Sequence, residues 1–349
     1  MSNPIFINGR FLTQAMTGIQ RFSYEICKAL ICKNVDLIIL APRTIRAEYD
    51  LPCRITRFGV FRNILWEQID LPVFLMKHKN PLLLNLGNTG PVFYPNRIVT
   101  VHDLSFYIHP EWFSKSYRIY YRFVTPLVIR FSKKVITVSE CSKKEIIART
   151  GIREEKITVV RNAVSGVFRN RQSQGGRAQG RFIFSVSSLD PRKNMGRLVA
   201  AYHMAGISDE IKLVLAGRAD PIFNIEAPEE ILAHSVGYIP DEELSDLYQH
   251  AILFVYPSLY EGFGLPPLEA MSLGCPVILS DIPVFREVFG DAAHYVDPLS
   301  SVSIRDGIIH VLSDESYRTE LIRRGFERAS RFNWDSSADN ILSMICDCA

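Results

Sequence analysis

Short apolar runs alternate with amphipathic stretches along the whole chain. Runs of this kind are typical of strands that are buried on both faces of a parallel sheet. In the first half we predict strands at 4–8, 37–40, 55–58, 82–86, 98–101, 135–138 and 157–160. Helical periodicity lies between several of them, as in Ile19, Phe22, Ile26 and Leu30, which share one face. Alternating strands and helices predict a doubly wound α/β domain.

Three stretches of the first half carry signals about where their helices begin or break. Residues 63–78 have a helical pattern, with a break predicted near Pro72. Residues 112–134 combine aromatic and basic side chains, and we expect Pro126 to interrupt a helix there. Ser142 and Glu145 have capping-box spacing, which predicts a helix that begins at this point.

The alternation restarts after a polar, glycine-rich segment at 168–180, which we interpret as a flexible linker region. Strands are predicted beyond it at 182–186, 213–215, 236–239, 252–255, 277–279 and 295–296. The pattern therefore predicts an N-terminal domain at 1–167 and a second domain at 181–332, followed by a last helix within 333–349.

Composition narrows the class of protein. With 349 residues and a formal net charge of +3, the chain has the size of two domains and lacks the strong positive charge of a nucleic-acid binder. No apolar run has the length that spans a bilayer, and no signal-peptide pattern occurs at the N-terminus. The seven cysteines have no framework spacing. We therefore expect a cytoplasmic protein with free thiols.

The stretch from Tyr256 to Asp281 has the pattern strand, loop, helix, strand. Gly262 and Gly264 permit a tight loop and close approach of a ligand to the backbone. Two prolines follow, at positions that suit the first turn of a helix. The N–H groups of Gly264 and Leu265, together with the helix dipole, would attract a phosphate.

Two acids flank this predicted anion site. Glu261 lies before it and Glu269 lies within the helix. Eight helical residues span about 12 Å, whereas a retaining glycosidase needs carboxyl groups about 5 Å apart. The spacing instead suits the two ends of one long ligand with phosphates between them. A nucleotide sugar has this layout of sugar, diphosphate, ribose and base.

The run Glu-Gly-Phe-Gly-Leu-Pro-Pro-Leu-Glu-Ala-Met, from Glu261 to Met271, resembles the donor-site signature of retaining glycosyltransferases of family 4, which have the GT-B fold. The resemblance implies two Rossmann-like doubly wound domains that face a cleft, with the last helix packed back on the N-terminal domain. It further implies that Glu261 faces the transferred sugar, that Glu269 binds the ribose, and that Phe263, Gly264 and Leu265 line the donor site.

A second segment of the chain, from Ser187 to Asn194, resembles the phosphate-binding segment of the same family through its Pro-Arg-Lys-Asn run. Arg192 and Lys193 lie where a predicted strand ends, and adjacent cations suit a diphosphate. The alternative is a solvated basic turn. Many members of the family carry another arginine several residues earlier, where this chain has Ser187 and Ser188.

Further positions enter through the same resemblance. His102 and Asp103 end a strand of the first domain, and the family's catalytic-cleft histidine is expected to donate to a hydroxyl of the transferred sugar. The alternative is a packed histidine beside a helix-capping aspartate. Gly18 would let the backbone approach the sugar and the phosphates. The segment 236–239, which ends at Ile239, resembles the one that contacts the base through its backbone, and Gly217 is expected at a similar edge of the cleft.

The resemblance also implies the course of the reaction. The family keeps the anomeric configuration, and no residue of this chain is an obvious covalent nucleophile. Arg192, Lys193 and the helix start after Gly264 would stabilise the leaving diphosphate. No Asp-x-Asp occurs in the sequence, so we expect donor binding without a metal and no cofactor.

The acceptor is less well defined than the donor. The opening segment, with Asn8-Gly9-Arg10 and Thr17-Gly18-Ile19, resembles bacterial enzymes that build surface polysaccharides such as O-antigen. GDP-mannose is the expected donor, and UDP- or dTDP-sugars are the next alternatives. A glycan or a lipid-diphosphate-linked oligosaccharide is the expected acceptor. Residues 112–134 suit either a core helix with a basic edge or peripheral contact with the inner membrane surface.

Two hypotheses from other classes stay open. A nonhydrolysing nucleotide-sugar epimerase shares the two-domain fold, although its pattern of acid and histidine is not evident. A catalytically silent sugar-binding scaffold would lose donor residues, yet Glu261, Glu269, Arg192 and Lys193 are all present. An NAD dehydrogenase is disfavoured, since no Gly-x-Gly-x-x-Gly follows the first strand.

Overall fold

The computed structural model describes residues 4–169, 181–186, 190–217 and 229–348. The chain divides into two compact units. The first comprises Met1–Leu104, Ile119–Asn162 and Asn333–Ala349, and the second comprises Ser105–Arg118 and Ala163–Phe332. The second unit thus includes a segment that lies within the predicted N-terminal domain. The predicted linker region at 168–180 lies outside the described residues from position 170 onward.

A parallel sheet forms the centre of the first unit, in the order β3-β2-β1-β4-β5-β6-β7. Its strands are β1 (Ile5–Asn8), β2 (Leu37–Ala41), β3 (Arg54–Arg57), β4 (Leu83–Asn85), β5 (Arg97–Thr100), β6 (Lys134–Thr137) and β7 (Ile157–Val159). The predicted apolar runs all form strands. In the inner strands, β-branched and leucine side chains are buried on both faces of the sheet, whereas the edge strand β3 is only partly buried.

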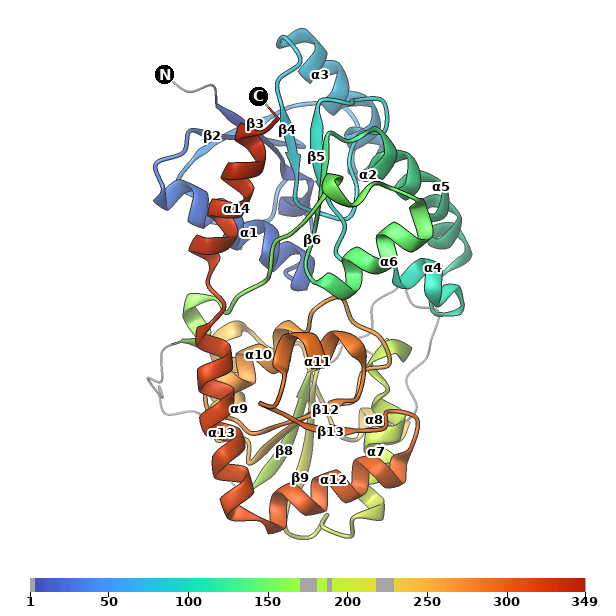
Figure 1. Cartoon of the computed structure of the whole chain (residues 1–349), viewed down its shortest axis with the longest axis vertical. Helices are drawn as coiled ribbons and strands as arrows, with labels where there is room; N and C mark the ends of the chain where they lie inside the picture. Colours follow the sequence, from blue (N-terminus) through green and yellow to red (C-terminus); the bar gives the residue numbers. More distant parts are fainter. Residues whose placement is uncertain (1–3, 170–180, 187–189, 218–228, 349) are drawn as a thin grey trace. The chain divides into compact units, whose positions relative to one another are not determined.

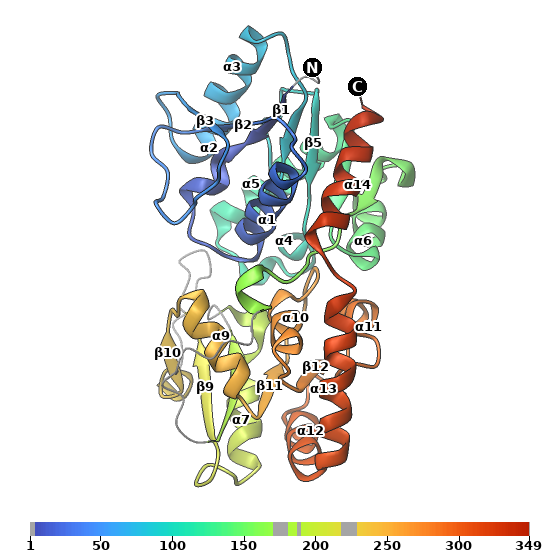
Figure 2. The same cartoon turned by 90° about the vertical axis from the view of Figure 1, so that its left-hand side faces the viewer.

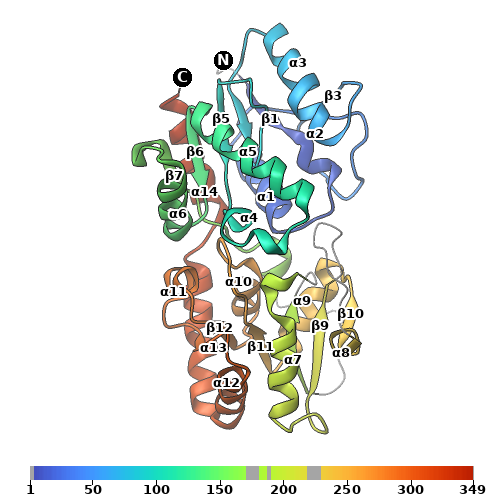
Figure 3. The same ribbon diagram turned by 90° about the vertical axis from the view of Figure 1, so that its right-hand side faces the viewer.

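Helices cover both faces of this sheet. Figure 2 looks onto the face with α1 (Gly18–Cys32) and α14 (Trp334–Cys346), which pack against each other. Figure 3 looks onto the opposite face, with α3 (Leu71–Lys77) and α5 (Lys115–Phe131). The unit also contains α2 (Asn63–Leu65), a π-helical turn η2 (Trp66–Asp70), α6 (Glu140–Thr150), and the short 3₁₀ segments η1 (Gly9–Thr13) and η4 (Glu154–Lys156). The last helix of the chain therefore belongs to the first unit.

Three predictions about these helices are wrong. The irregular turn in 63–77 is η2, whereas Pro72 lies without a break in the first turn of α3. Pro126 lies inside a continuous α5. Helix α6 begins after Ser139, whose side chain accepts from the N–H of Ser142 at 3.0 Å. Ser142 is therefore a residue of the helix and not its N-cap.

The second unit repeats the strand order of the first. Its parallel sheet has the order β10-β9-β8-β11-β12-β13. The strands are β8 (Phe182–Val186), β9 (Lys212–Ala216), β10 (Ser235–Gly237), β11 (Leu253–Tyr256), β12 (Val277–Ser280) and β13 (His294–Val296). In both sheets the order reverses beside the first strand, and this reversal defines a doubly wound fold. The predicted fold class, two Rossmann-like α/β domains, is confirmed.

The helices of the second unit enclose an aliphatic core. Leu198, Leu253, Ile278 and Ile308 belong to it and are completely buried. Figure 1 shows the helices around the sheet. They are α7 (Met195–Met204), α8 (Glu229–Leu232), α9 (Asp241–His250), α10 (Leu265–Ser272), α11 (Pro283–Phe289), α12 (Ser301–Ser313) and α13 (Glu315–Ser330), with 3₁₀ segments η5 (Gly166–Phe168) and η6 (Pro191–Lys193). The segment Ser105–Arg118 of this unit contains α4 (Ser105–Ile108) and η3 (Pro110–Trp112).

None of the helices in the described ranges combines the length and the apolar character that a bilayer crossing requires. The reversal of strand order in the second unit falls between β8 and β11. In sheets of this kind, ligands bind beyond the carboxyl ends of the two strands at the reversal. We therefore expect a ligand site at the segments that follow β8 and β11.

Candidate functional site

A buried lysine joins the two segments at this point of the second unit. Lys193, at the end of η6, forms an ion pair with Glu261 in the loop after β11. The same ammonium group donates to the hydroxyl of Tyr256 at 2.5 Å and lies 4.9 Å from the centre of its ring. Lys193 and Glu261 come from positions 68 residues apart. The fold thus brings together two of the residues that the sequence analysis assigned to the donor site.

Burial and charge act against each other in this pair. Burial lowers the pKa of Lys193, and the carboxylate of Glu261 partly restores it. Burial also opposes ionisation of Glu261, but the charges of Lys193 and Arg192 outweigh it and hold its pKa below the usual range. The neighbouring cations therefore favour the charged form of the Glu261 carboxylate. A site with fixed charges in a mostly dry environment suits recognition of an ionic ligand.

Arg192 is held beside Lys193 by the first residue of the segment. Its side-chain Nε donates to Asp190 at 3.0 Å and its backbone N–H donates to the other oxygen of that carboxylate at 2.9 Å. Asp190 is the N-cap of η6, so one side chain both starts the 3₁₀ turn and orients the arginine. This arrangement differs from the alternative of a solvated basic turn, since Lys193 is buried and Arg192 is half-buried.

Asn194 fixes the position of the basic segment relative to two other loops. It has a φ of 60°, a left-handed conformation that asparagine adopts more easily than most residues. Its side-chain N–H₂ donates to the carbonyl of Pro257 at 3.0 Å and to that of Pro298 at 2.7 Å. The loops after β8, β11 and β13 are thereby tied together by one amide.

The start of α10 has the geometry that the sequence predicts. Gly264 is the N-cap and has a φ of 102°, which disfavours any side chain. A Cβ at this position would lie 2.9 Å from the ring of Phe285 and 3.1 Å from that of Phe289. Leu265 is the first helical residue, and the prolines at the next two positions have no N–H. The free N–H groups at this helix end are therefore concentrated at its first residues.

Glu269 and Phe263 point into the second unit. Glu269 is buried and accepts from the hydroxyl of Tyr248, a fully buried residue of α9, at 3.2 Å. The buried ring of Phe263 packs edge-on against Phe332. Both contacts hold α10 and the loop before it in a fixed position. The role of Glu269 at a ribose and that of Phe263 at the donor stay predictions.

The edge of the sheet at β9 and β10 carries Ile239, from the segment predicted to contact a base, and Gly217, predicted at the edge of the cleft. Gly217 follows β9 and has a φ of 142°, and its N–H donates to the carbonyl of Gly237 at 2.7 Å. Ile239 lies half-buried two residues beyond β10. Gly237 also has a positive φ, of 78°. The local backbone at both strand ends thus depends on glycine, while the contact with a base stays a prediction.

In the first unit, His102 is buried against the edge of the Phe22 ring. Its Nε2 lies 3.0 Å from the carbonyl oxygen of Leu86, which can only accept, so Nε2 carries the hydrogen. Burial lowers the pKa of His102, which leaves the ring neutral and Nδ1 as an acceptor. Nδ1 can therefore accept a hydrogen bond but not donate one, which differs from the donating role that we expected. A contact of this ring with a sugar stays a prediction.

The other predicted residues of the first unit are placed less specifically. Asp103 directly follows His102 in the loop before α4 and is half-buried. Gly18 is exposed and is the first residue of α1. Its exposure leaves room for a ligand to approach the helix start.

Sequence reasoning missed three supporting residues in the second unit. They are Tyr256, which shares the ammonium of Lys193, Asp190, which orients Arg192, and Asn194, which joins three loops. Signals for the last two were present, since Asp and Asn are the residues that cap helices and tolerate a left-handed backbone. No local sequence pattern distinguishes Tyr256, because its contact with Lys193 depends on the pairing of β8 with β11.

Two Rossmann-like units, each with a doubly wound parallel sheet, have the architecture of the GT-B class, and one of them carries a charged site at its strand reversal. The family model for glycosyl transferases group 1 matches residues 167–328. The model for glycosyltransferase family 4 matches residues 16–165. The chain belongs to this family of glycosyltransferases, as its motifs predict, and it is an enzyme of that class.

Curated relatives of known name cover most of the chain. O-antigen chain mannosyltransferase B of Escherichia coli is 33% identical over 276 residues, which are 73% of this chain and 72% of the relative. O-antigen chain mannosyltransferase RfbU of Salmonella typhimurium is 31% identical over 370 aligned positions, covering 98% of this chain and 99% of the relative.

Solved structures share the fold at lower identity. Sucrose-phosphate synthase from Thermosynechococcus elongatus has a TM-score of 0.74 and 20% identity, and the match covers 99% of both chains. WaaG, a glycosyltransferase involved in lipopolysaccharide biosynthesis, has a TM-score of 0.74 and 14% identity, over 98% of this chain and 99% of WaaG. At these identities the likeness concerns the GT-B fold alone.

Proposed function

We propose that this enzyme is a retaining mannosyltransferase that moves mannose from GDP-mannose to a growing, lipid-linked glycan. The glycan would be O-antigen or a similar surface polysaccharide. The choice of mannose rests on two relatives that are named O-antigen chain mannosyltransferases. We infer donor binding from the ion pair of Lys193 and Glu261, which lies at the strand reversal of the second unit.

Each of these groups of the second unit would contact one part of the donor. Arg192 and Lys193 meet the diphosphate, and the N–H groups of Gly264 and Leu265 meet it from the start of α10. These groups stabilise negative charge as the diphosphate leaves, so the reaction needs no metal and no cofactor. Glu261 faces the transferred sugar through the oxygen that Lys193 does not hold. Glu269 binds the ribose, while Gly217 and Ile239 lie beside the base.

The first unit contributes the acceptor side and the sugar contact in this proposal. His102 accepts a hydrogen bond from a hydroxyl of the mannose, with Asp103 beside it, and Gly18 lets the backbone of α1 approach. Retention follows from a front-face displacement, in which the leaving phosphate takes the proton of the acceptor hydroxyl. The enzyme would then act in the cytoplasm, where nucleotide sugars are made.

The experiment is product analysis with GDP-mannose and a glycan acceptor. Transfer gives an acceptor longer by one mannose, and NMR of the new linkage gives its anomeric configuration. An epimerase would instead return a changed free donor, and a silent scaffold would return both substrates unchanged. GDP-mannose should also raise the unfolding temperature more than UDP- or dTDP-sugars, because a ligand that binds the native state stabilises it. An inverted linkage, or a preference for another donor, contradicts the proposal.

A further inference from the structure

A buried carboxylate lies at the strand reversal of the first unit. The order of this sheet reverses between β1 and β4, and each of these strands ends in a buried asparagine, Asn8 or Asn85. The side-chain nitrogen of Asn8 donates to the side-chain oxygen of Asn85 at 2.9 Å and to the carboxylate of Glu67 at 2.8 Å. Because ligands bind beyond the strand ends at such a reversal, Glu67 lies at a second position of the chain where a site is expected.

A π-helical turn directs Glu67 to this position. Glu67 belongs to η2, and only 1% of its side chain is exposed. Its Oε1 accepts from Asn8, and its Oε2 accepts from the guanidinium of Arg10 at 2.8 Å and from the hydroxyl of Thr89 at 3.1 Å. Both carboxylate oxygens are thus held in place. Single π-helical turns occur frequently at functional sites.

Arg10 extends from this carboxylate toward the surface. Its side chain is 12% exposed, so it is the more accessible member of the ion pair. Burial lowers the pKa of Arg10, but the charge of Glu67 and the contact with Tyr121 outweigh burial and hold the pKa above its ordinary value. An arginine has five N–H donors. Within the part of the chain that the structure describes, Glu67 and Tyr121 are the hydrogen-bond partners of the guanidinium, which leaves donors for a ligand.

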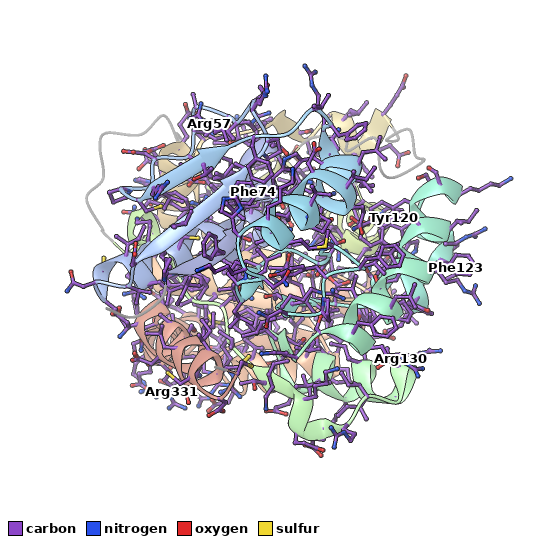
Figure 4. The ribbon with its side chains drawn as sticks, turned by 90° about the horizontal axis from the view of Figure 1, so that it is seen from above. Arg57, Phe74, Tyr120, Phe123, Arg130 and Arg331 are labelled. Atoms are coloured by element: carbon purple, nitrogen blue, oxygen red, sulfur yellow. The ribbon has the colours of Figure 1, made fainter. Side chains whose placement is uncertain are left out.

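Tyr120 of α5 lies beside the ion pair. Burial raises the pKa of Tyr120 to about 12, and the charge of Glu67 adds to this effect while that of Arg10 opposes it. The phenol is therefore close to both charges. Tyr120 is half-buried, and Figure 4 shows it turned toward the rest of the unit, whereas Phe123 and Arg130 of the same helix lie on the outer side.

The loop after β4 connects these side chains to His102. Thr89 lies in that loop next to Asn88. The side-chain oxygen of Asn88 accepts from the backbone N–H of His102 at 2.7 Å. His102 is the residue that we propose to contact the transferred sugar, and an acceptor must bind next to that sugar. The connection therefore favours an acceptor site at Arg10.

The charges favour an uncharged ligand group over an anionic one. A phosphate on Arg10 would also meet the carboxylate of Glu67, which already neutralises the guanidinium. Arg97 also lies near Glu67, but it is completely buried and donates to the carbonyls of Pro91 at 2.7 Å and Val128 at 3.0 Å. A sugar, in contrast, offers hydroxyl groups to the N–H donors and an apolar face to a tyrosine ring.

We propose that these side chains, which we call the Glu67 cluster, bind the terminal, uncharged sugar of the glycan acceptor. Arg10 and Tyr120 contact its hydroxyl groups, and Glu67 is a positioning residue that fixes the guanidinium. The inference rests on the proposed function for the nature of the substrate, a glycan acceptor, and deepens it by naming the chemical group that the first unit recognises. The cluster consists of Asn8, Arg10, Glu67, Asn85, Thr89 and Tyr120.

The test measures sugar binding by the full-length enzyme in the absence of a donor. Saturation-transfer NMR is recorded with a panel of neutral disaccharides that end in mannose, galactose, glucose, rhamnose or N-acetylglucosamine. Titration of the disaccharide that binds gives its dissociation constant. Inorganic pyrophosphate is the anionic probe, and calorimetry measures its affinity and stoichiometry.

The variants change the ion pair and the phenol separately. The double variant Arg10→Gln/Glu67→Gln removes both charges together, so that no buried charge is left unpaired. Tyr120→Phe removes one hydroxyl group. The controls are Arg57→Gln, at an exposed arginine of β3 (Figure 4), and Tyr24→Phe, at a half-buried tyrosine of α1 whose hydroxyl donates to a backbone carbonyl at 2.9 Å.

The wild type should bind one of the neutral disaccharides. We expect the double variant to bind it at least roughly tenfold more weakly and Tyr120→Phe to bind it about two- to tenfold more weakly. Arg57→Gln and Tyr24→Phe should bind it as the wild type does. Pyrophosphate binding, which we assign to the second unit, should be unchanged in all four variants.

The single variant Glu67→Gln separates a positioning role from a merely structural one. It leaves the charge of Arg10 without its carboxylate, so sugar binding should weaken while a second pyrophosphate binds per chain. The KM for a glycan acceptor should rise in this variant, and the KM for the donor should stay unchanged. Loss of sugar binding without the second pyrophosphate would contradict the positioning role.

Several results would overturn the proposal. They are a wild type that binds none of the neutral disaccharides, or sugar binding that the double variant and Tyr120→Phe leave unchanged. Loss of pyrophosphate binding in the double variant would assign Arg10 to a phosphate instead. Circular dichroism and unfolding temperature are measured first, and if the double variant does not fold, Tyr120→Phe decides, since it changes only one half-buried hydroxyl group.

Mannose transfer from GDP-mannose is assayed separately. Its absence in the wild type contradicts the proposed function alone and leaves the sugar-binding result readable. Transfer that proceeds with the same acceptor KM in the wild type and in Tyr120→Phe contradicts the present inference alone.

Discussion

Lys193 and Glu261 form a buried ion pair in which each charge depends on its partners. A buried pair contributes little net stability, because desolvation offsets most of the attraction. Removing one partner is costly, however, since it leaves a buried charge without compensation. The ammonium has the hydroxyl of Tyr256 as a second partner, whereas the carboxylate depends on nearby cations to stay ionised.

The first prediction concerns removal of this counter-charge. Lys193→Met should lower the free energy of unfolding by about 3 kcal/mol at neutral pH. Adding Glu261→Gln to it should recover part of the loss, because the unpaired carboxylate is gone. Thermal unfolding midpoints of the wild type, both single variants and the double variant measure this coupling. Strictly additive shifts would show that the two charges do not interact.

The pH dependence of that cycle has a definite sign. In the wild type the pKa of Glu261 is depressed, so its contribution is present at neutral pH and is lost as the pH falls through the folded-state pKa. Without Lys193, only Arg192 and Ser258 are left to oppose the effect of burial, so we expect the pKa of Glu261 to rise and its carboxylate to destabilise the variant at neutral pH. The difference between wild type and Lys193→Met should therefore shrink as the pH is lowered. A difference that grows toward acid pH contradicts this assignment.

The second prediction separates the two acids of the motif. Glu261→Gln should lower kcat strongly, because contacts to the transferred sugar tighten in the transition state. Glu269→Gln should mainly raise the KM for the donor, because ribose is held alike in both states. Tyr248 can still donate to the amide oxygen, so the variant should fold. Steady-state kinetics at varied donor concentration decide, and a collapse of kcat in Glu269→Gln alone would reverse the two roles.

At the scale of elements, the start of α10 depends on a glycine for two separate reasons. Gly264 needs a positive φ, and the rings of Phe285 and Phe289 leave no room for a Cβ. Gly206, in the same unit, has a φ of 65° and nothing within 4 Å of the position of a Cβ. A comparison of substitutions at the two glycines therefore distinguishes the cost of backbone strain from the cost of steric contact.

The third prediction compares alanine at these positions. Gly206→Ala should cost about 1–2 kcal/mol from strain alone. Gly264→Ala should cost a further 1–3 kcal/mol or so from overpacking, and it alone should weaken donor binding, since it moves the N–H groups of the helix start. Unfolding temperature and calorimetry with GDP-mannose measure the two effects. Equal costs at both positions would mean that the phenylalanine rings yield freely.

Helices and strands with a regular hydrophobic pattern were predictable from the sequence. Features that depend on contacts between residues far apart in the sequence were not. Apolar runs gave the strands of both sheets because buried strands need side chains of one kind on both faces. The π-helical turn at Trp66 was missed because two successive residues, Trp66 and Glu67, both point inward, and this follows from tertiary contacts. The cap of α6 was misplaced because Ser139 and Ser142 have equal propensity, and the end of β6 at Thr137 decides between them.

The same distinction applies to the candidate site. The positions of Arg192, Lys193, Glu261 and Gly264 follow from local motifs. The pairing of Lys193 with Glu261 does not, because it depends on β8 lying beside β11. The hydrogen-bonding role of His102 also required the structure, since the carbonyl of Leu86, from the end of another strand, fixes which nitrogen carries the hydrogen.

At the scale of the whole molecule, two units of the same strand order carry different chemistry. The first has a neutral, buried histidine beside its sheet and a buried ion pair at its strand reversal. The second has charged side chains and a helix start at its strand reversal. The charged groups that we propose for the donor thus lie in one unit, and the neutral histidine lies in the other.

The last prediction follows from the charges that the second unit supplies. An enzyme that uses a metal to hold a diphosphate loses activity when the metal is removed. Here Arg192, Lys193 and the start of α10 would take that role, so mannose transfer should persist at an undiminished rate in excess EDTA. Arg192→Ala should instead weaken donor binding roughly tenfold, since a charge-assisted hydrogen bond contributes about 1.5–3 kcal/mol. Activity that EDTA abolishes and magnesium or manganese restores would show that a metal neutralises the diphosphate. Unchanged affinity in Arg192→Ala would remove the arginine from that role.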